Sequence, residues 1–417
     1  MPNRRNAIYL LLIISLLTGL FTGRSLFFNI AYLLGGLLAI SFAWSWISVR
    51  WISLSRKTRA RRAQVGRSLD EAFIVRNRTI LPKLWLEVRD HSTLPGHRAS
   101  HVVPALGGRR NYRWYVETPC LVRGEFQLGP VTLISGDPFG FFLTPRRLDA
   151  TSRVIVYPAT VPINQVHLPM GLLSGGAAQR QRAHHITTNA AGIRDYVPGD
   201  SFNRIHWPST ARKDRLLVKE FEIDPLVDIW LFVDFSSTSL VEEPTVQRVG
   251  RTGPVIPTSQ AIPASTEEYG VVVAASLAKY FIESERSLGF VGYTPHREVH
   301  QPERGNRQLT RILQTLAVAR SLSSYSLQQM LTLETPYLTR GTTLVIVTAS
   351  LEQDWINEAQ ILSRRGIRPM CILVDPHSFG GNKPADETVA LLRLGRIPTL
   401  VVHKGDDLSM ALAQRPG

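Results

Sequence analysis

Cysteine is scarce in this chain, whose 417 residues include only Cys120 and Cys371. The two are far apart, and neither belongs to a CxxC pair or has His partners at a metal-binding spacing. This pattern excludes a disulfide scaffold and gives no support to a structural zinc site. Such sparse use of cysteine fits a reducing compartment.

Several catalytic motifs are also absent from the sequence. It contains no GxxxxGKS or GxxxxGKT phosphate loop, no HExxH, no GxSxG and no GxGxxG. The common routes to nucleotide binding, zinc-dependent proteolysis and serine hydrolysis therefore have no support. We assign no catalytic residue, and we expect a protein that is not an enzyme.

Acidic residues are missing from the N-terminal part of the chain, where Asp70 is the first. Ten of the 48 Lys and Arg residues precede it and supply most of the net charge of +15. They are Arg4, Arg5, Arg24, Arg50, Arg56, Lys57, Arg59, Arg61, Arg62 and Arg67. The rest of the chain holds 38 basic and 33 acidic residues. Because this balance is not that of a nucleic-acid-binding surface, we expect no nucleic-acid partner.

The N-terminus does contain two long uncharged runs, Ala7–Thr22 and Ser25–Val49, joined by a turn with Arg24. About 20 apolar residues span the ~30 Å hydrocarbon layer of a bilayer. We therefore predict a transmembrane helical hairpin over residues 1–50, followed by a basic juxtamembrane segment over residues 51–69. A cleaved signal peptide is the alternative for the first run, although no A-x-A-like cleavage site follows it.

Basic residues on both sides of this hairpin predict its orientation. Lys and Arg resist translocation, so Arg4, Arg5 and the Arg50–Arg67 cluster should stay in the cytoplasm. We expect a multi-pass protein of the cell membrane with a cytoplasmic soluble body and with membrane lipids among its partners. The cluster either marks topology alone or also binds anionic lipids, and the sequence leaves both interpretations open.

From Asp70 onward the hydrophobic pattern changes to the alternation that is typical of β-strands. Runs of this kind are Ala72–Arg76, Leu84–Arg89 and Tyr112–Glu117. Gly- and Pro-containing turns separate them at spacings typical of a small antiparallel sandwich. We predict a β-sandwich-like domain over residues 70–165, with a structural or binding role because it shows no cluster of His, Cys or acidic residues.

Residues 166–225 form a connector that is rich in motifs. Pro198-Gly199 is a turn pair, and Asp200 has a side chain that can cap a short helix. Basic and acidic residues nearly cancel here, which favours internal ion pairs over an anion-binding patch. Taken by itself, the pattern indicates a turn–helix–strand clip that locks two domains together.

The same connector resembles a known family. The signature residues in this chain are Arg194, Tyr196, Pro198, Gly199, Asp200, Trp207 and Arg212. This run resembles the bacterial family called domain of unknown function 58, and the upstream run that begins at Arg123 and the pair of apolar helices are similar to it as well. The resemblance implies a C-terminal domain of von Willebrand factor type A fold and a MoxR-type AAA+ ATPase as partner.

The remaining residues, 226–417, alternate between strand-like and helical runs. Expected strands are Val227–Val233, Leu288–Tyr293, Thr343–Thr348, Met370–Val374 and Thr399–His403. Expected helices are Glu267–Glu285, Asn306–Arg320, Leu351–Arg365 and Ala385–Leu394. This alternation predicts an α/β domain whose parallel sheet is covered by helices on both faces. Ligands of such sheets bind at the carboxyl ends of the strands.

A candidate metal site follows the first of these strands. Asp234, Ser236 and Thr238 alternate there, and their oxygens can converge on a hard cation such as Mg²⁺. The run is similar to the metal-ion-dependent adhesion site of von Willebrand factor type A domains. Those domains also place an acid after a later strand, where this chain has Ala349. Two interpretations remain, a weak Mg²⁺ site and a turn capped by Ser and Thr side chains.

Together these features predict a multidomain protein with two N-terminal transmembrane helices, a β-sandwich-like domain and an α/β von Willebrand A-like domain. We expect a membrane-anchored cytoplasmic scaffold or adaptor that binds protein partners. The family resemblance implies work with a MoxR-type AAA+ ATPase in the assembly or maturation of envelope complexes. The alternatives are a metal-dependent hydrolase and an exported adhesion-like binding protein, each using the Asp234 site.

Overall fold

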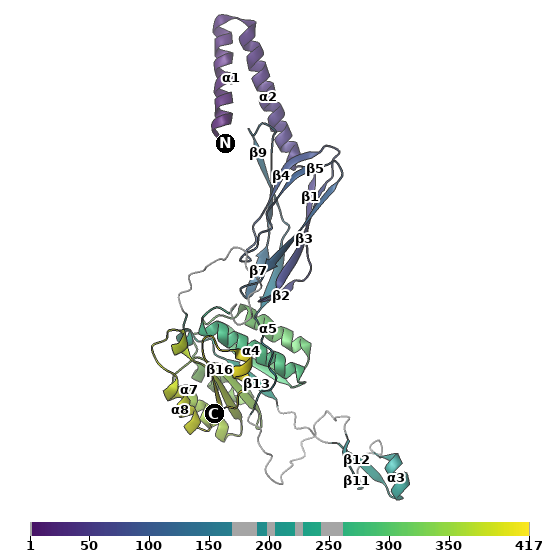
Figure 1. Cartoon of the computed structure of the whole chain (residues 1–417), viewed down its shortest axis with the longest axis vertical. Coiled ribbons are helices and arrows are strands. Elements are labelled where there is room, and N and C mark those ends of the chain that lie inside the picture. Colours follow the sequence, from purple (N-terminus) through teal and green to yellow (C-terminus); the bar gives the residue numbers. More distant parts are fainter. Residues whose placement is uncertain (1, 169–189, 198–204, 222–227, 243–261, 417) are drawn as a thin grey trace.

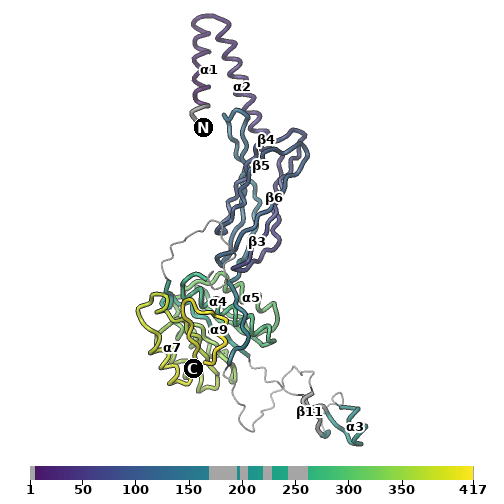
Figure 2. Tube along the Cα trace, in the orientation of Figure 1, coloured from purple at the N-terminus to yellow at the C-terminus, as the bar shows by residue number. Residues whose placement is uncertain are grey.

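The structure is a computed structural model that describes residues 2–168, 190–197, 205–221, 228–242 and 262–416. Along the long axis of the molecule the chain passes from an N-terminal helical hairpin through a β-rich domain to an α/β domain (Figure 1). The trace of the Cα atoms shows the same succession (Figure 2).

The hairpin consists of α1 (Pro2–Thr22) and α2 (Ser25–Val49). Both helices are long and apolar enough to cross a membrane. They lie side by side, and Ser15 Oγ of α1 donates a hydrogen bond to the Phe27 carbonyl of α2 at 2.7 Å. Gly23 adopts φ +65° in the turn, a conformation that glycine accepts without strain. The two predicted apolar helices are confirmed.

The β-rich domain contains three sheets. The first has the order β1 (Ile52–Thr58), β3 (Ser68–Asn77), β6 (Asn111–Pro119). The second has the order β5 (His101–Leu106), β4 (Lys83–Asp90), β8 (Val131–Gly136), β9 (Leu143–Leu148). The third has the order β2 (Arg62–Gln64), β10 (Ser152–Tyr157), β7 (Gly124–Leu128). Alternate residues of the first two sheets face each other and bury Phe73, Val75, Leu86, Val88 and Leu133, as in a sandwich.

This domain begins earlier in the chain than the sequence predicted. Residues 51–69, expected as a basic juxtamembrane segment, contain β1 and β2. The antiparallel pairing of β1 with β3 runs from Ile52 opposite Asn77 to Thr58 opposite Glu71. The first strand of the sandwich is therefore β1 and the last is β10. The domain also ends earlier than predicted, because Ala159 already packs in the core of the α/β domain.

A small unit of the connector is described separately. It consists of β11 (Ala190–Asp195), α3 (Trp207–Lys213) and β12 (Leu217–Phe221). The two strands pair antiparallel, and α3 lies against β12.

The α/β domain has a six-stranded sheet of order β15-β14-β13-β16-β17-β18. Its strands are β13 (Ile229–Val233), β14 (Leu288–Thr294), β15 (His296–Glu303), β16 (Thr343–Thr348), β17 (Arg368–Val374) and β18 (Thr399–Val402). All neighbours pair in parallel except the edge strand β15, which runs antiparallel to β14. The predicted parallel sheet is confirmed.

Helices cover both faces of this sheet, so that its strands other than the edge strand β15 are largely buried on both sides. One face packs on α4 (Thr266–Glu283), α5 (Asn306–Val318) and α9 (Leu408–Ala413). The other face packs on α6 (Leu327–Glu334), α7 (Asp354–Arg364) and α8 (Asp386–Leu394). Short 3₁₀ turns occur at η2 (Ser237–Ser239), η4 (Thr335–Tyr337) and η5 (Pro376–Phe379).

The sandwich and the α/β domain meet through α5, which contacts β7 and β10. The connector was predicted to be the clip between the two domains. In the part of the chain that the structure describes, the contact instead involves these elements and Arg123, a fully buried side chain from the turn before β7.

Candidate functional site

Asp234 lies directly after β13, at the carboxyl end of the sheet. The chain leaves β13 toward α4 and β14 on one side, while β16 is its parallel neighbour on the other side. The order of strands reverses here. In open α/β sheets this is the point at which ligands bind.

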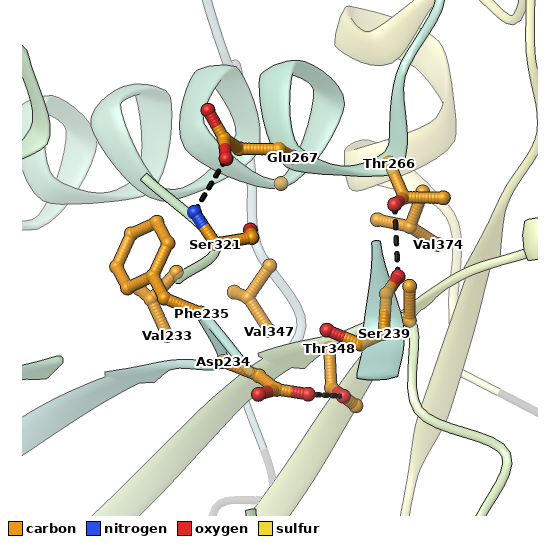
Figure 3. Close-up of a pocket in the computed structure, with 12 residues that line it drawn as sticks. Val233, Asp234, Phe235, Ser239, Thr266, Glu267, Ser321, Val347, Thr348 and Val374 are labelled. Atoms are coloured by element: carbon orange, nitrogen blue, oxygen red, sulfur yellow. Dashed lines mark hydrogen bonds between the residues drawn. The ribbon is translucent and has the colours of Figure 1, made fainter. Parts of the chain in front are cut away.

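Hydrogen bonds from the ends of two strands hold the Asp234 carboxylate in place. Its Oδ1 accepts from the Ser236 amide at 2.9 Å. Its Oδ2 accepts from Thr348 Oγ1 at 2.7 Å (Figure 3). The Asp234 amide donates to the Val347 carbonyl at 2.9 Å. The carboxylate therefore has a fixed orientation at the edge of the sheet.

The electrostatic setting of Asp234 is that of a half-buried acid whose neighbours are hydroxyl groups and a backbone amide. Burial raises the pKa of Asp234, and this effect outweighs hydrogen bonds from Thr348, Ser236 and Ser239, which act in the opposite direction. The groups with the largest effects on this pKa are Thr348, Ser236 and Ser239, and none of them is basic. Because an isolated buried charge is costly, a bound cation would stabilise the ionised carboxylate.

The three predicted metal ligands are brought together by a 3₁₀ turn. Thr238 Oγ1 donates to Ser236 Oγ at 3.4 Å, and Ser236 Oγ donates to Ser239 Oγ at 3.1 Å. Ser239 Oγ in turn donates to the Ser236 carbonyl at 2.9 Å. Ser236 is buried, whereas Thr238 is exposed. The site thus has the Ser and Thr contacts of a capped turn and also a carboxylate beside them.

A cavity of about 10 Å³ opens next to Asp234. Its wall includes Ser239, Thr266, Glu267 and Ser321. Thr266 Oγ1 donates to the Ser239 carbonyl at 3.0 Å, and the Ser321 amide donates to Glu267 Oε2 at 2.5 Å (Figure 3). A volume of this size holds a single water-sized group. Pockets for small organic ligands start at about 300 Å³.

Sequence reasoning missed Thr348 as a member of this site. Thr348 is the last residue of β16, a strand that was predicted correctly and that pairs in parallel with β13. Because the carboxyl ends of parallel strands meet at one edge of a sheet, this rule could have placed Thr348 near Asp234. Ala349 lines the cavity where a second acid was expected. Among the residues that the structure describes, no group of three or more His, Cys, Asp or Glu side chains is placed to hold a metal.

Glu267 connects the cavity wall to the sandwich. Arg123 Nη2 pairs with Glu267, and Arg123 Nε donates to both carboxylate oxygens of Glu268 at 2.9 Å. Arg123 Nη1 donates to the carbonyls of Leu316 at 2.6 Å and Ala319 at 2.7 Å, at the carboxyl end of α5. A cation is favoured at this end of a helix. We call this set of contacts the Arg123 clasp.

The family signature lies in the small unit of the connector. Arg194 is in β11, Tyr196 follows that strand, and Trp207 and Arg212 belong to α3. Pro198, Gly199 and Asp200 are outside the described residues. Trp207 is 62% exposed, which is unusual for a large indole side chain on a folded unit.

Asp200, which was predicted to cap a short helix, lies outside the described residues. The helix that the structure describes in this unit, α3, begins at Trp207, and His206 is its N-cap. His206 Nδ1 accepts a hydrogen bond from the Ser209 amide at 3.2 Å. The imidazole therefore caps the N-terminus of α3, a role that Ser, Thr, Asp or Asn has at most helix starts.

Residues 192–248 match a family whose description is "Protein of unknown function DUF58". This range includes the signature residues and the run from Asp234 to Thr238. The chain is also similar to the uncharacterized protein YeaD of Bacillus subtilis (strain 168), with 23% identity over 346 residues that cover 79% of this chain and 76% of YeaD. These matches support the DUF58 family.

Solved structures give weaker similarity. The CARDB domain of the PF1109 protein from Pyrococcus furiosus is 16% identical, with a TM-score of 0.19 and coverage of 25% of this chain and 86% of that chain. The pilus adhesin SpaC from Lactobacillus rhamnosus GG is 11% identical, with a TM-score of 0.30 and coverage of 45% of this chain and 29% of that chain.

Proposed function

We propose that this protein is a membrane-anchored scaffold that binds a protein partner through a divalent cation held at Asp234. The observation that carries the proposal is the half-buried carboxylate of Asp234 at the switch point of the sheet, held by the Thr348 hydroxyl and the Ser236 amide. Such a site supplies negative charge and oxygen donors where α/β sheets bind their ligands.

The donor set fits a hydrated Mg²⁺ ion. Mg²⁺ usually keeps several water molecules and binds proteins through one or two carboxylates. Asp234 would supply the carboxylate, and Ser236, Thr238 and Thr348 would supply hydroxyl oxygens or hold water. With one acidic ligand, the ion keeps net positive charge and can receive a carboxylate from a partner protein.

The size of the cavity supports binding rather than the conversion of a small molecule. Space for one water-sized group accommodates an ion or the tip of a partner side chain. A hydrolase at the same residues needs room for a substrate beside the metal. We therefore favour the scaffold over the metal-dependent hydrolase.

The order of strands also supports a von Willebrand A-like domain. The first strand of the domain, β13, lies in the centre of the sheet, and the single antiparallel strand, β15, lies at the edge. The Asp-x-Ser-x-Thr run follows that central strand, as the adhesion-site resemblance implies. We propose that the α/β domain has this fold and presents its carboxyl edge to the partner.

We further propose that α1 and α2 anchor the protein in the cell membrane and that its body is cytoplasmic. Arg4 and Arg5 at the start of α1 and Arg50 after α2 support this orientation, because basic residues flank membrane helices on the cytoplasmic side. The family resemblance names the partner that we propose, a MoxR-type AAA+ ATPase acting in assembly or maturation of envelope complexes.

Titration calorimetry on the full chain in detergent tests the cation site. Mg²⁺ or Mn²⁺ should bind the wild type weakly, with a dissociation constant of about 10⁻⁴–10⁻³ M, as at weak oxygen-ligand sites. Binding should be lost in Asp234→Asn. Asp375→Asn is the matched control, because Asp375 is a buried acid after β17 that caps η5. Equal cation binding by the wild type and Asp234→Asn would refute the site.

A further inference from the structure

We propose that the end of the sandwich next to α2 is itself a membrane-binding surface, whose apolar loop residues enter the headgroup layer and whose arginines bind anionic lipid phosphates. We call this surface the sandwich tip and define it by residues 50–51, 78–85, 107–110 and 137–143. The inference rests on the proposed insertion of α1 and α2 in the membrane.

The register of the strands brings these loops to one end of the domain. Ile52, the first residue of β1, pairs with Asn77, so residues 78–85 begin beside the end of α2. Lys83 Nζ confirms this by donating to the Ile47 carbonyl at 2.6 Å. Leu86 pairs with Ser135, which puts the β8–β9 loop at the same end. Residues 107–110 join them, because the Arg109 amide donates to the Thr79 carbonyl at 2.8 Å.

Contacts with the hairpin fix the level of the β8–β9 loop relative to the bilayer. The Phe142 ring packs against Phe42 of α2 with centroids 5.6 Å apart, and Ser45 Oγ lies 2.7 Å from Thr144 Oγ1. The guanidinium of Arg5, near the start of α1, lies 5.8 Å from the centre of the same Phe142 ring. A basic residue at the end of a membrane helix sits at the headgroup level. The loop therefore reaches the depth of the lipid headgroups.

The tip exposes large apolar side chains at this level. Ile80 is 75% exposed, Leu81 56%, Phe139 52% and Leu143 49%. Trp51 is 53% exposed in the first residue after the Arg50 cap of α2. Apolar groups gathered on several loops are costly in water but favourable in the interfacial layer of a bilayer, where aromatic rings are enriched.

The loop that carries Phe139 is preorganised. Asp137, which is 7% exposed, accepts hydrogen bonds from the Phe139 amide at 3.0 Å and the Phe142 amide at 2.7 Å. The Phe139 and Phe141 rings stack with centroids 5.7 Å apart. Little conformational entropy is lost on insertion, because the exposed ring is already held in position.

The charge of the tip is complementary to anionic lipids. Arg50, Arg78, Arg109 and Arg110 are exposed there. The acid within the defined residues of the tip is Asp137, whose carboxylate is buried against backbone amides. Each arginine near an anionic surface adds to the electrostatic attraction.

Arg56 and Arg59, two later members of the Arg50–Arg67 run for which the sequence left lipid binding open, do not lie at the tip. The strand β1 leads away from α2, and its Arg56 side chain is 3% exposed inside the sandwich. Arg59, which follows β1, pairs with Asp70 at 3.5 Å at the other end of the domain. The lipid-facing charge therefore comes from loops that are distant in sequence, and this arrangement could not be predicted from the run itself.

Site-directed spin labelling of the full chain in lipid nanodiscs tests the proposal. Phe139→Cys and Ile80→Cys report on the tip, Leu33→Cys reports on the exposed middle of α2, and Leu121→Cys reports on the opposite end of the sandwich. The native Cys120 and Cys371 are fully buried and should stay unlabelled. Burial raises the pKa of Cys120 to about 11, which keeps its thiol unreactive.

We expect the labels at Phe139 and Ile80 to be accessible to oxygen and shielded from a water-soluble nickel chelate, at a shallower depth than the label at Leu33. The label at Leu121 should be fully accessible to the chelate. If the labels at Phe139 and Ile80 are as accessible to the chelate as the label at Leu121, while the label at Leu33 is shielded in lipid, the membrane-binding role of the tip is wrong and the membrane anchor still holds. A Leu33 label in water overturns the membrane anchor itself.

A second arm tests the lipid charge. The combined Arg78→Glu, Arg109→Glu and Arg110→Glu exchange should move the Phe139 label toward the value of Leu121 in discs with phosphatidylglycerol. Arg67→Glu, an exposed arginine at the opposite end of the sandwich, is the matched control and should leave the label unchanged. An unchanged Phe139 label in both variants contradicts the lipid-binding role of the arginines.

Discussion

At the scale of single residues, Asp234 combines two properties that oppose each other. Its carboxylate is held in one orientation by hydrogen bonds from Ser236 and Thr348. Burial raises its pKa, which means that the ionised form destabilises the folded chain when no cation is present. A residue that lowers stability in the free protein is typical of a binding site.

Asp234→Asn should therefore stabilise the cation-free protein. A raised pKa means that the folded state keeps the proton more firmly, so stability falls as the pH rises through the folded pKa. The neutral amide avoids this loss, and we expect a melting temperature about 2 °C higher than the wild type in chelator at pH 8. The gain should shrink at pH 4. Thermal unfolding at both pH values checks this, and a less stable variant at pH 8 contradicts it.

A second residue-scale feature is the buried polar network of the sandwich. Arg56 pairs with Glu71 at 3.3 Å and also with Asp90, and His97 Nε2 lies 3.1 Å from Asp90 Oδ2. All four side chains are at most 3% exposed. Burial alone would raise the pKa of Asp90, but hydrogen bonds from His97 and Ser92 and the charge of Arg56 together lower it.

Asp90→Asn should destabilise the sandwich by about 3 kcal/mol at pH 7, because it leaves a buried cation poorly compensated. A lowered pKa gives stability that is present above the ordinary value of 3.8 and is lost as the pH falls through the folded pKa. The difference in the free energy of unfolding between the wild type and Asp90→Asn should therefore disappear in strong acid. Asp70→Asn, which breaks an exposed pair with Arg59, should change stability by less than about 1 kcal/mol. Denaturant unfolding that ranks the two variants equally would falsify the assignment.

At the scale of elements, buried strands were the most predictable part of the fold. The predicted strand Thr343–Thr348 has the bounds of β16, and the strands predicted around β13, β14, β17 and β18 differ from them by few residues, because continuous apolar runs leave little ambiguity. The edge strand β15 was missed because most of its residues are polar and none of them is buried. The hydrogen bond between Asp234 and Thr348 joins residues 114 positions apart and depends on the order of the strands in the sheet. The hydrophobic periodicity of a sequence does not reveal that order.

The Arg123 clasp makes a prediction for the contact between domains. Arg123→Ala should leave Glu267 and Glu268 without their buried cation and weaken the contact by about 3–5 kcal/mol. Hydrogen exchange should then rise in the first turn of α4 and around Leu316–Ser321. Arg123→Lys should restore only part of the protection, because it lacks the fork that contacts two carboxylates and two carbonyls.

Arg153→Ala is the control for this experiment, because Arg153 is on β10 of the same domain and its side chain is 83% exposed. It should leave exchange in both segments at the wild-type rate. Protection that survives in Arg123→Ala contradicts the clasp as the main contact between sandwich and α/β domain.

At the scale of the whole molecule, the sandwich separates the hairpin from the α/β domain along the long axis (Figure 1). The clasp holds Glu267, which lines the cavity beside Asp234, against the sandwich. The proposed cation site therefore lies on the edge of the α/β domain that contacts the sandwich. A partner bound there would be held near the membrane.

The orientation of this arrangement is testable with a reporter fused after Gly417. We expect alkaline phosphatase to be inactive and a fluorescent reporter that folds only in the cytoplasm to be bright, because Arg5 and Arg50 flank the hairpin on one side. Replacing Arg5 and Arg50 by Glu should lower the fraction of molecules whose C-terminus lies in the cytoplasm. The opposite reporter pattern contradicts a cytoplasmic body and favours the exported adhesion-like alternative.

The central claim is that a cation at Asp234 governs the binding of a partner. The most direct test is affinity capture of the full chain from native membranes, in Mg²⁺ and in chelator, with the MoxR-type ATPase quantified by mass spectrometry. Our account predicts enrichment with the wild type and with Asp375→Asn in Mg²⁺, and loss of that enrichment in chelator and in Asp234→Asn. Equal enrichment by the wild type and Asp234→Asn, with or without Mg²⁺, would contradict it.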